Sequence, residues 1–156
     1  MWSERADRRE NGRVLDVTVR REIYSVLAAT GHAPSHGAIV ELVGDTEEAG
    51  RVLRRLHEAH ALVVDDTGEI LMALPFAARP TQHRVLADSR SWWANCAWDS
   101  LAIPAALGID ARIEAAWLDT GEPVQLAIDD GQLNRTDGFI HFTIPAHHWW
   151  DDIVET

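Results

Sequence analysis

A thiol and a carboxylic acid lie close together in the second half of the sequence. Cys96 is the only cysteine among 156 residues, and Asp99 follows it three positions later. On a helix, that spacing places both side chains on one face, within reach of each other. A protonated aspartic acid beside a thiolate can take up the thiol proton and later deliver it to a carbanion-like leaving group. These two residues are therefore the candidate catalytic pair.

The surrounding residues set expectations for how the two groups ionise. Asn95 is a candidate N-cap, so Cys96 would lie in the first helical turn, where unpaired backbone N–H groups lower a thiol pKa. For Asp99 two effects compete, because nearby tryptophans raise the pKa of a carboxyl and the helix start lowers it. The spacing by itself favours an inert, buried Cys96. It is equally consistent with Asp99 as an ordinary acid of the first turn.

The composition is that of a soluble globular protein with strong acidic character. The 25 acidic residues outnumber the 14 basic ones, all of them arginines, for a formal net charge of -11. Such a field repels phosphate backbones and anionic lipids, so we expect neither nucleic acid nor a membrane as a partner. The chain starts without the apolar stretch of a signal peptide, and no run approaches the ~18 apolar residues of a membrane span. A single free thiol fits a reducing compartment, and we expect a cytoplasmic location.

The first half predicts a small helical unit. Residues 1–15 are charged and lack an apolar period, so we expect a flexible arm before a unit that spans residues 16–77. The expected elements are three helices and a hairpin, at 18–30, 35–43, 46–60 and 61–73. This order is typical of a winged helix. The unit carries five arginines against nine acids between residues 20 and 75, so we favour a packing module over a DNA reader.

The second half predicts a catalytic-type unit over residues 78–156. After a polar connector at 78–89, the residues 91–108 predict one apolar helical stretch with a kink or a restart at Pro104, which lacks the N–H for a helical hydrogen bond. Three strands are expected after it, at 111–118, 124–128 and 139–144. They should form a small, largely antiparallel sheet against the tryptophan-rich helix. The predicted fold class of the whole chain is therefore α+β.

Residues 95–108, Asn-Cys-Ala-Trp-Asp-Ser-Leu-Ala-Ile-Pro-Ala-Ala-Leu-Gly, resemble the active-site segment of the organomercurial (alkylmercury) lyases. The turn at 120–124, Thr-Gly-Glu-Pro-Val, and the winged-helix-like unit extend this resemblance over most of the chain. It implies an alkylmercury lyase that cleaves carbon–mercury bonds by protonolysis to a hydrocarbon and Hg²⁺. Cys96 would bind the mercury of the substrate, as soft thiolates do, and Asp99 would protonate the departing carbon.

In that family a second cysteine on a later strand acts with the first, and this sequence contains no second cysteine. The resemblance therefore implies a catalytic unit that is truncated relative to the family and has reduced activity. A small thiol or another chain would supply the second mercury ligand. His147, His148 and His141, the last on the strand expected at 139–144, are weaker substitutes, because imidazole suits zinc or copper better than mercury.

The implied reaction sets the remaining expectations. Trp93 and Trp98 are candidates to line the pocket for the organic group, although tryptophans at such spacing are more often plain core. The partners would be an organomercurial small molecule, low-molecular-weight thiols and a mercuric reductase that accepts Hg²⁺, with no resident cofactor. Two alternatives stay open. One is a non-catalytic family member that binds mercury, another metal or a partner, and the other is a winged-helix regulator.

Overall fold

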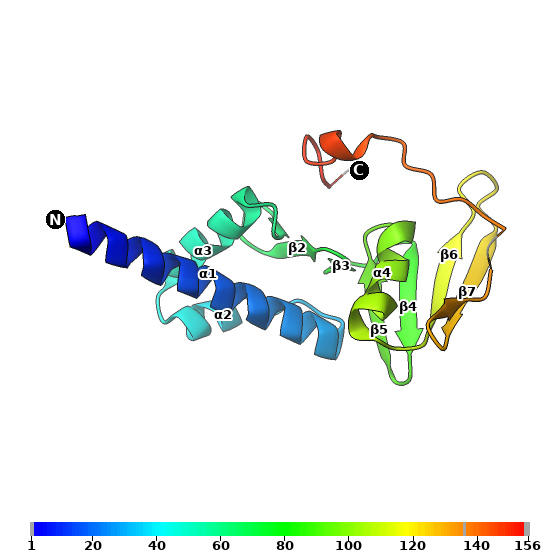
Figure 1. The fold of residues 1–156 in the computed structure, drawn as a ribbon, viewed down its shortest axis with the longest axis horizontal. Coiled ribbons are helices and arrows are strands. Elements are labelled where there is room, and N and C mark those ends of the chain that lie inside the picture. Colours follow the sequence, from blue (N-terminus) through cyan, green and yellow to red (C-terminus); the bar gives the residue numbers. More distant parts are fainter. Residues whose placement is uncertain (1, 136, 155–156) are drawn as a thin grey trace. The chain divides into compact units, whose positions relative to one another are not determined.

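The chain forms two compact units, Met1–Leu74 and Pro75–Thr156, which are described separately. The computed structural model describes the backbone of residues 2–135 and 137–154, and the side chains from residue 12 onward. Within these residues there are four α-helices and eight strands (Figure 1), which confirms the predicted α+β class. The boundary between the units lies slightly before the one expected between residues 77 and 78. No described helix has the length and apolar character needed to cross a membrane.

The first unit contains three helices, which are α1 (Trp2–Thr30), α2 (His36–Val43) and α3 (Thr46–Glu58). Helices α2 and α3 are both capped, since the Ser35 hydroxyl accepts the N–H of Ala38 and the Asp45 carboxylate accepts the N–H of Glu48 at 2.7 Å. Such caps satisfy backbone donors that have no partner inside the helix. The inner faces of the three helices supply most of the buried aliphatic side chains of the unit, namely Val19, Ile23, Leu27, Ile39, Val52, Leu53 and Leu56.

Helix α1 begins much earlier than predicted. The arm expected over residues 1–15 is instead helical from Trp2 onward, while Met1 lies outside the described residues. Residues 2–15 contain four arginines and two glutamates, which favour a helix even without an apolar stripe. Directly after this segment, within α1, Asp16 accepts a hydrogen bond from Arg55 of α3 over an Nη2–Oδ1 distance of 2.7 Å. This ion pair ties α1 to α3 at a point that an apolar-period analysis does not detect.

Strands β1 (Val63–Val64) and β2 (Ile70–Ala73) form the predicted antiparallel hairpin. In its turn, the Asp65 carboxylate accepts the N–H of Thr67 at 2.9 Å. Gly68 has a φ of 86°, a conformation that costs little energy only for glycine. The order of three helices and a hairpin therefore matches the expectation, and the winged-helix interpretation of this unit stays a prediction.

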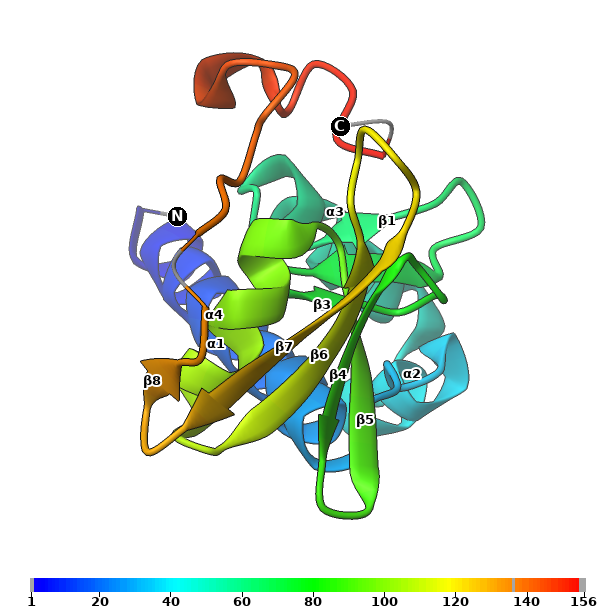
Figure 2. The same cartoon turned by 90° about the vertical axis from the view of Figure 1, so that its right-hand side faces the viewer.

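The second unit is an antiparallel sheet with one helix, α4 (Ala97–Leu107), packed against one face (Figure 2). Its strand order is β3-β5-β4-β6-β7-β8. The bounds are β3 (Phe76–Ala77), β4 (His83–Ala87), β5 (Arg90–Ala94), β6 (Ala111–Ala116), β7 (Pro123–Asp129) and β8 (Gln132–Leu133). Val85 lies opposite both Trp92 and Ile113, and all three are at most 1% exposed. Because opposed residues share a face of the sheet, these side chains form the core beneath α4.

Two elements near the start of this unit differ from the predictions. The polar connector expected at 78–89 contains the central strand β4, in which Val85 and Ala87 are buried. The helix expected from residue 91 is preceded by strand β5, where buried Trp92 and half-buried Trp93 alternate in the manner of a strand. Helix α4 therefore starts only at Ala97, and it continues through Pro104 without ending there.

The prediction of a strand at 139–144 is also wrong. No strand occurs there, and Phe139 is 98% exposed. The edge position beside β7 is taken by β8, which the sequence analysis missed. Asp130 and Gly131 between these strands have φ values of 51° and 71°, as a tight two-residue hairpin turn requires. The chain therefore returns at once along β7, and in the rest of the described chain it forms only a short 3-10 turn at 146–148.

Candidate active site

Cys96 is the N-cap of helix α4. Strand β5 ends at Ala94 and the helix begins at Ala97, so the cysteine lies in the short connection between them. Its backbone is extended, and its Sγ accepts a hydrogen bond from the backbone N–H of Asp99 at 3.5 Å. The expectation that Asn95 caps this helix is wrong, because the thiol occupies that position and leaves the Asn95 amide free for other partners.

The Cys96 thiol and the Asp99 carboxyl contact each other, and burial dominates the ionisation of both. Burial raises the pKa of the Cys96 thiol, and the Asp99 carboxylate adds to this effect, while the backbone N–H groups of Asp99 and Trp98 oppose it. The expected lowering of the Cys96 pKa is therefore wrong, since desolvation outweighs the helix start. Burial also raises the pKa of Asp99, against hydrogen bonds from Asn95 and Cys96 that lower it. Both groups consequently hold their protons more tightly than usual.

Asn95 completes this polar cluster, and the sequence analysis did not foresee that role. Its Nδ2 donates one hydrogen bond to the carbonyl of Pro75 at 3.3 Å and another to Oδ2 of Asp99 at 3.2 Å. The preceding residue, Ala94, is held as well, because its carbonyl accepts a hydrogen bond from the Thr81 hydroxyl at 2.6 Å. The sequence does show an amide next to the cysteine. It does not show the partners of that amide, because these depend on the register of the sheet.

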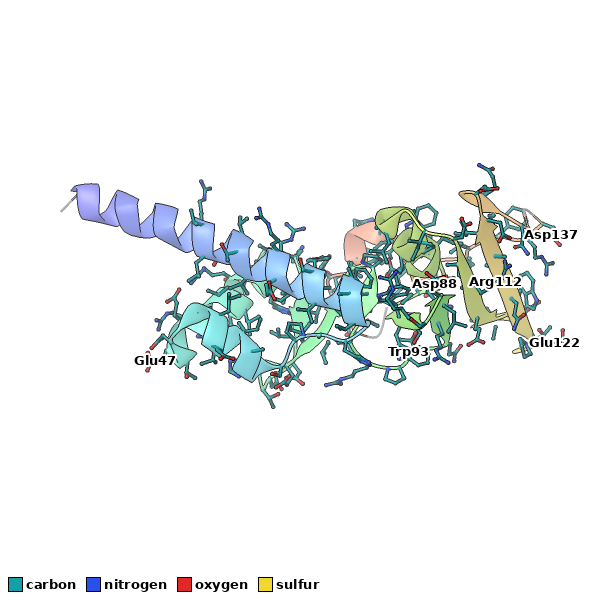
Figure 3. All side chains as sticks on the ribbon, turned by 90° about the horizontal axis from the view of Figure 1, so that it is seen from below. Glu47, Asp88, Trp93, Arg112, Glu122 and Asp137 are labelled. Atoms are coloured by element: carbon teal, nitrogen blue, oxygen red, sulfur yellow. The ribbon has the colours of Figure 1, made fainter. Side chains whose placement is uncertain are left out.

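The two tryptophans expected to line a substrate pocket come from different elements. Trp93 lies on β5 (Figure 3), half-buried, with the Arg84 guanidinium 5.4 Å from its ring centroid. Trp98 lies in the first turn of α4 and is 57% exposed. The tryptophan that belongs to the core is Trp92, which is 1% exposed. The exposure of Trp98 leaves its ring accessible to a ligand, and the pocket assignment stays a prediction.

His83 is a desolvated histidine that the sequence analysis did not single out. The register of β4 and β5 places it opposite Ala94, two residues before Cys96, on the face that α4 covers. Burial lowers its pKa, and its Nδ1 has no hydrogen-bond partner among the described residues. It is therefore a neutral imidazole near the end of β5 at physiological pH.

The histidines considered as substitute ligands do not gather around the thiol. His141 is exposed and lies outside any strand, which corrects its predicted position. The rings of His147 and His148 are 4.1 Å apart, and Nδ1 of His148 lies 2.7 Å from the Asp151 carboxylate. In the part of the chain that the structure describes, no group of three or more His, Cys, Asp or Glu side chains is arranged to hold a metal ion.

The second unit is thus defined by an antiparallel sheet whose connection to a covering helix carries a cysteine and an aspartic acid. Residues 76–156, just over half of the 156-residue chain, match the family model described as MerB, alkylmercury lyase. The chain belongs to the alkylmercury lyase family.

Individual relatives agree with this assignment. An alkylmercury lyase from Bacillus cereus is 32% identical over 87 residues, which cover 56% of this chain and 38% of the relative. One from Staphylococcus epidermidis is 28% identical over 113 residues, which cover 72% of this chain and 50% of the relative. The crystal structure of the mercury-bound form of MerB2 is similar with a TM-score of 0.63 at 25% identity, covering 78% of this chain and 59% of that one. The matched segments therefore span half or less of the length of the two lyases from Bacillus cereus and Staphylococcus epidermidis.

Proposed function

We propose that this protein is an alkylmercury lyase, which cleaves the carbon–mercury bond of an organomercurial by protonolysis. The observation that carries the proposal is the Cys96–Asp99 pair, a half-buried thiol in contact with a half-buried carboxylic acid at the start of α4. The names of the relatives support the substrate class. Reduced activity is part of the proposal, because the chain has a single cysteine.

The proposed reaction needs no change of oxidation state. The substrate arrives as an organomercury complex with a small thiolate, and the Cys96 thiol passes its proton to Asp99 while its sulfur binds the mercury. The carbon–mercury bond then breaks, and its electron pair takes the proton from Asp99. The products are the hydrocarbon and Hg²⁺, which stays bound to Cys96 and the small thiolate.

The raised pKa values suit this sequence of steps. A raised pKa makes the Asp99 carboxylate a better acceptor for the thiol proton than an ordinary aspartate, and the resulting acid holds that proton until the carbon takes it. The thiol of Cys96 also keeps its proton until mercury replaces it, because burial disfavours the free thiolate. The proton that Cys96 loses when it binds mercury is thereby available on Asp99 for transfer to the departing carbon.

The remaining parts of the proposal concern the ligands around the pair. Trp93 and Trp98 would contact the organic group. The exposure of Trp98 supports this, because its ring is not packed in the core and can contact a ligand. A low-molecular-weight thiol would supply the second sulfur on mercury. It would also carry Hg²⁺ away to a mercuric reductase in the cytoplasm.

A direct assay tests the proposal. Purified protein is incubated with phenylmercury and excess small thiol, and released benzene and Hg²⁺ are measured over time. We expect benzene in proportion to protein, and none above background with Cys96→Ser or Asp99→Asn. Mercury that binds to the wild type without benzene release would replace the enzyme by the non-catalytic binding alternative.

The charges of the first unit argue against the regulator alternative. Arg51 on α3 is within 2.7 Å of Glu48 and 3.3 Å of Glu47, which projects outward from the helix (Figure 3). Arg55 is paired with Asp16 and Glu48. Two of the three arginines on α3 are thus already compensated by acids of the same unit. An electrophoretic mobility assay at physiological salt should show no shift of duplex DNA, and a shift would revive the regulator.

A further inference from the structure

The amide of Asn95 binds two oxygen atoms at once. One N–H of Nδ2 is directed to the carbonyl oxygen of Pro75 at 3.3 Å, and the other to Oδ2 of Asp99 at 3.2 Å. An amide nitrogen has two donors and no acceptor, so both of its hydrogen atoms are used. Asn95 thus connects the residue that precedes β3 with the acid of the candidate catalytic pair.

The Pro75 carbonyl determines which way the Asn95 amide faces. The oxygen and nitrogen of an asparagine side chain must be distinguished by their partners. A backbone carbonyl can only accept a hydrogen bond, so it requires the nitrogen of Asn95 and excludes its oxygen. Because both contacts are made by the same nitrogen, the atom facing Asp99 is also a donor.

This orientation distinguishes the two oxygens of Asp99. A neutral carboxylic acid has one carbonyl oxygen, which is the better acceptor, and one hydroxyl oxygen, which donates. With Oδ2 accepting from Asn95, the proton belongs on Oδ1. We infer that Asn95 is a positioning residue that makes Oδ1 the proton-carrying oxygen of Asp99 and holds it for transfer to the carbon bound to mercury. This inference rests on the proposed lyase function.

The surroundings of Asn95 are suited to such a role. Asn95 does not cap α4, because the thiol of Cys96 does, so its amide is not needed by the helix backbone. The strand end before it is held by the hydrogen bond from Thr81 to the Ala94 carbonyl. The amide is thus fixed at its backbone, at Pro75 and at Asp99. Groups that orient a catalytic side chain in this way commonly change activity by about 10–100-fold when removed.

The test separates binding of the mercurial from cleavage of its carbon–mercury bond. Wild type, Asn95→Ala and Asn95→Asp are mixed with phenylmercury in single-turnover experiments. Formation of the mercury–thiolate bond is followed by ultraviolet absorbance, and bond cleavage by released benzene. Asn134→Asp is the matched control, because it makes the same amide-to-carboxylate change in the same unit but keeps the oxygen that accepts the N–H of Ala127.

We expect both Asn95 variants to bind phenylmercury with affinity within about threefold of wild type and to release benzene about 10–100-fold more slowly. Asn134→Asp should match the wild type in both measurements. Unchanged benzene release in Asn95→Ala would overturn the inference, and so would an equal loss of binding and cleavage together with a lowered Tm, which indicates a purely structural role. A wild type that binds phenylmercury but releases no benzene would instead refute the lyase function itself, and the inference with it.

Discussion

The sulfur of Cys96 accepts the backbone N–H of Asp99 at 3.5 Å, so the candidate mercury ligand is also the cap of the helix that carries the acid. Serine, threonine, aspartate and asparagine are the residues that cap helices well, and a thiol is a weak acceptor. A cysteine at this position therefore gives up helix stability in exchange for a reactive sulfur, as is common at functional sites.

Replacing the thiol by a hydroxyl should separate stability from activity. Cys96→Ser is expected to keep the free energy of unfolding or raise it by up to about 1 kcal/mol, because a hydroxyl is the better N-cap. The same variant should lose phenylmercury cleavage entirely. Urea denaturation and benzene release measure the two effects. Cys96→Ala serves as the comparison and should be less stable than Cys96→Ser, and a Ser variant with wild-type turnover would contradict the role of the sulfur.

The reactivity of Cys96 should depend on the charge of Asp99. Burial keeps the thiol pKa above its ordinary value, and the Asp99 carboxylate raises it further. In Asp99→Asn the second effect is lost, so the pH profile of alkylation by iodoacetamide should move to lower pH while staying above that of a free cysteine. Asp88→Asn is the control, since Asp88 is exposed on the β4–β5 turn (Figure 3) and its positive φ of 52° is tolerated by asparagine. An identical profile for all three proteins would disprove the coupling.

Asp99 should also make folding stability depend on pH. Its pKa is raised in the folded protein by burial, so the folded state favours the protonated form. The stabilising contribution is therefore present below the ordinary pKa of an aspartate and is lost as the pH rises through the higher folded value. Unfolding free energies measured from acid to neutral pH should show Asp99→Asn gaining on the wild type as the pH increases. If the unfolding free energy of Asp99→Asn does not rise relative to that of the wild type as the pH increases, Asp99 is not desolvated.

Truncation of two tryptophans of the second unit should cost very different amounts of stability. Trp92→Ala removes a ring that is 1% exposed and should lower the free energy of unfolding by about 3–5 kcal/mol. Trp98→Ala removes a ring that is 57% exposed and should cost far less stability. If Trp98 contacts the organic group, its loss should raise the KM for phenylmercury more than for methylmercury. Equal KM changes for both substrates would exclude Trp98 from the pocket.

Local patterns were sufficient wherever a short segment determines its own structure. Helices were expected to start near residues 35 and 46, and both do, because a cap is set by the side chain and the backbone three residues on. The hairpin around Gly68 was predicted for the same reason, since its turn requires a positive φ. Cys96 and Asp99 were expected to meet on one face of a helix; they do meet, but Cys96 is the N-cap with an extended backbone rather than a helical residue.

The predictions failed where the conformation of a segment depends on neighbours that are distant in sequence. Residues 83–87 look polar, but they form a central strand because β5 and β6 pair with both of its edges. Trp92 and Trp93 suited an apolar helix in sequence, and strand pairing decided otherwise, because β-strand preference depends on packing against neighbouring strands. Residues 139–144 suited a strand, but β8 already occupies the available edge of β7.

The sequence by itself determined the candidate chemistry, a thiol and an acid three residues apart, because residue type and helical spacing are local properties. Only the tertiary structure decided how those groups ionise, since burial raises the pKa of Cys96 although the helix start alone would lower it. It also decided that Asn95 bonds to Asp99 rather than capping the helix, because Pro75 is brought to it by the fold of the second unit.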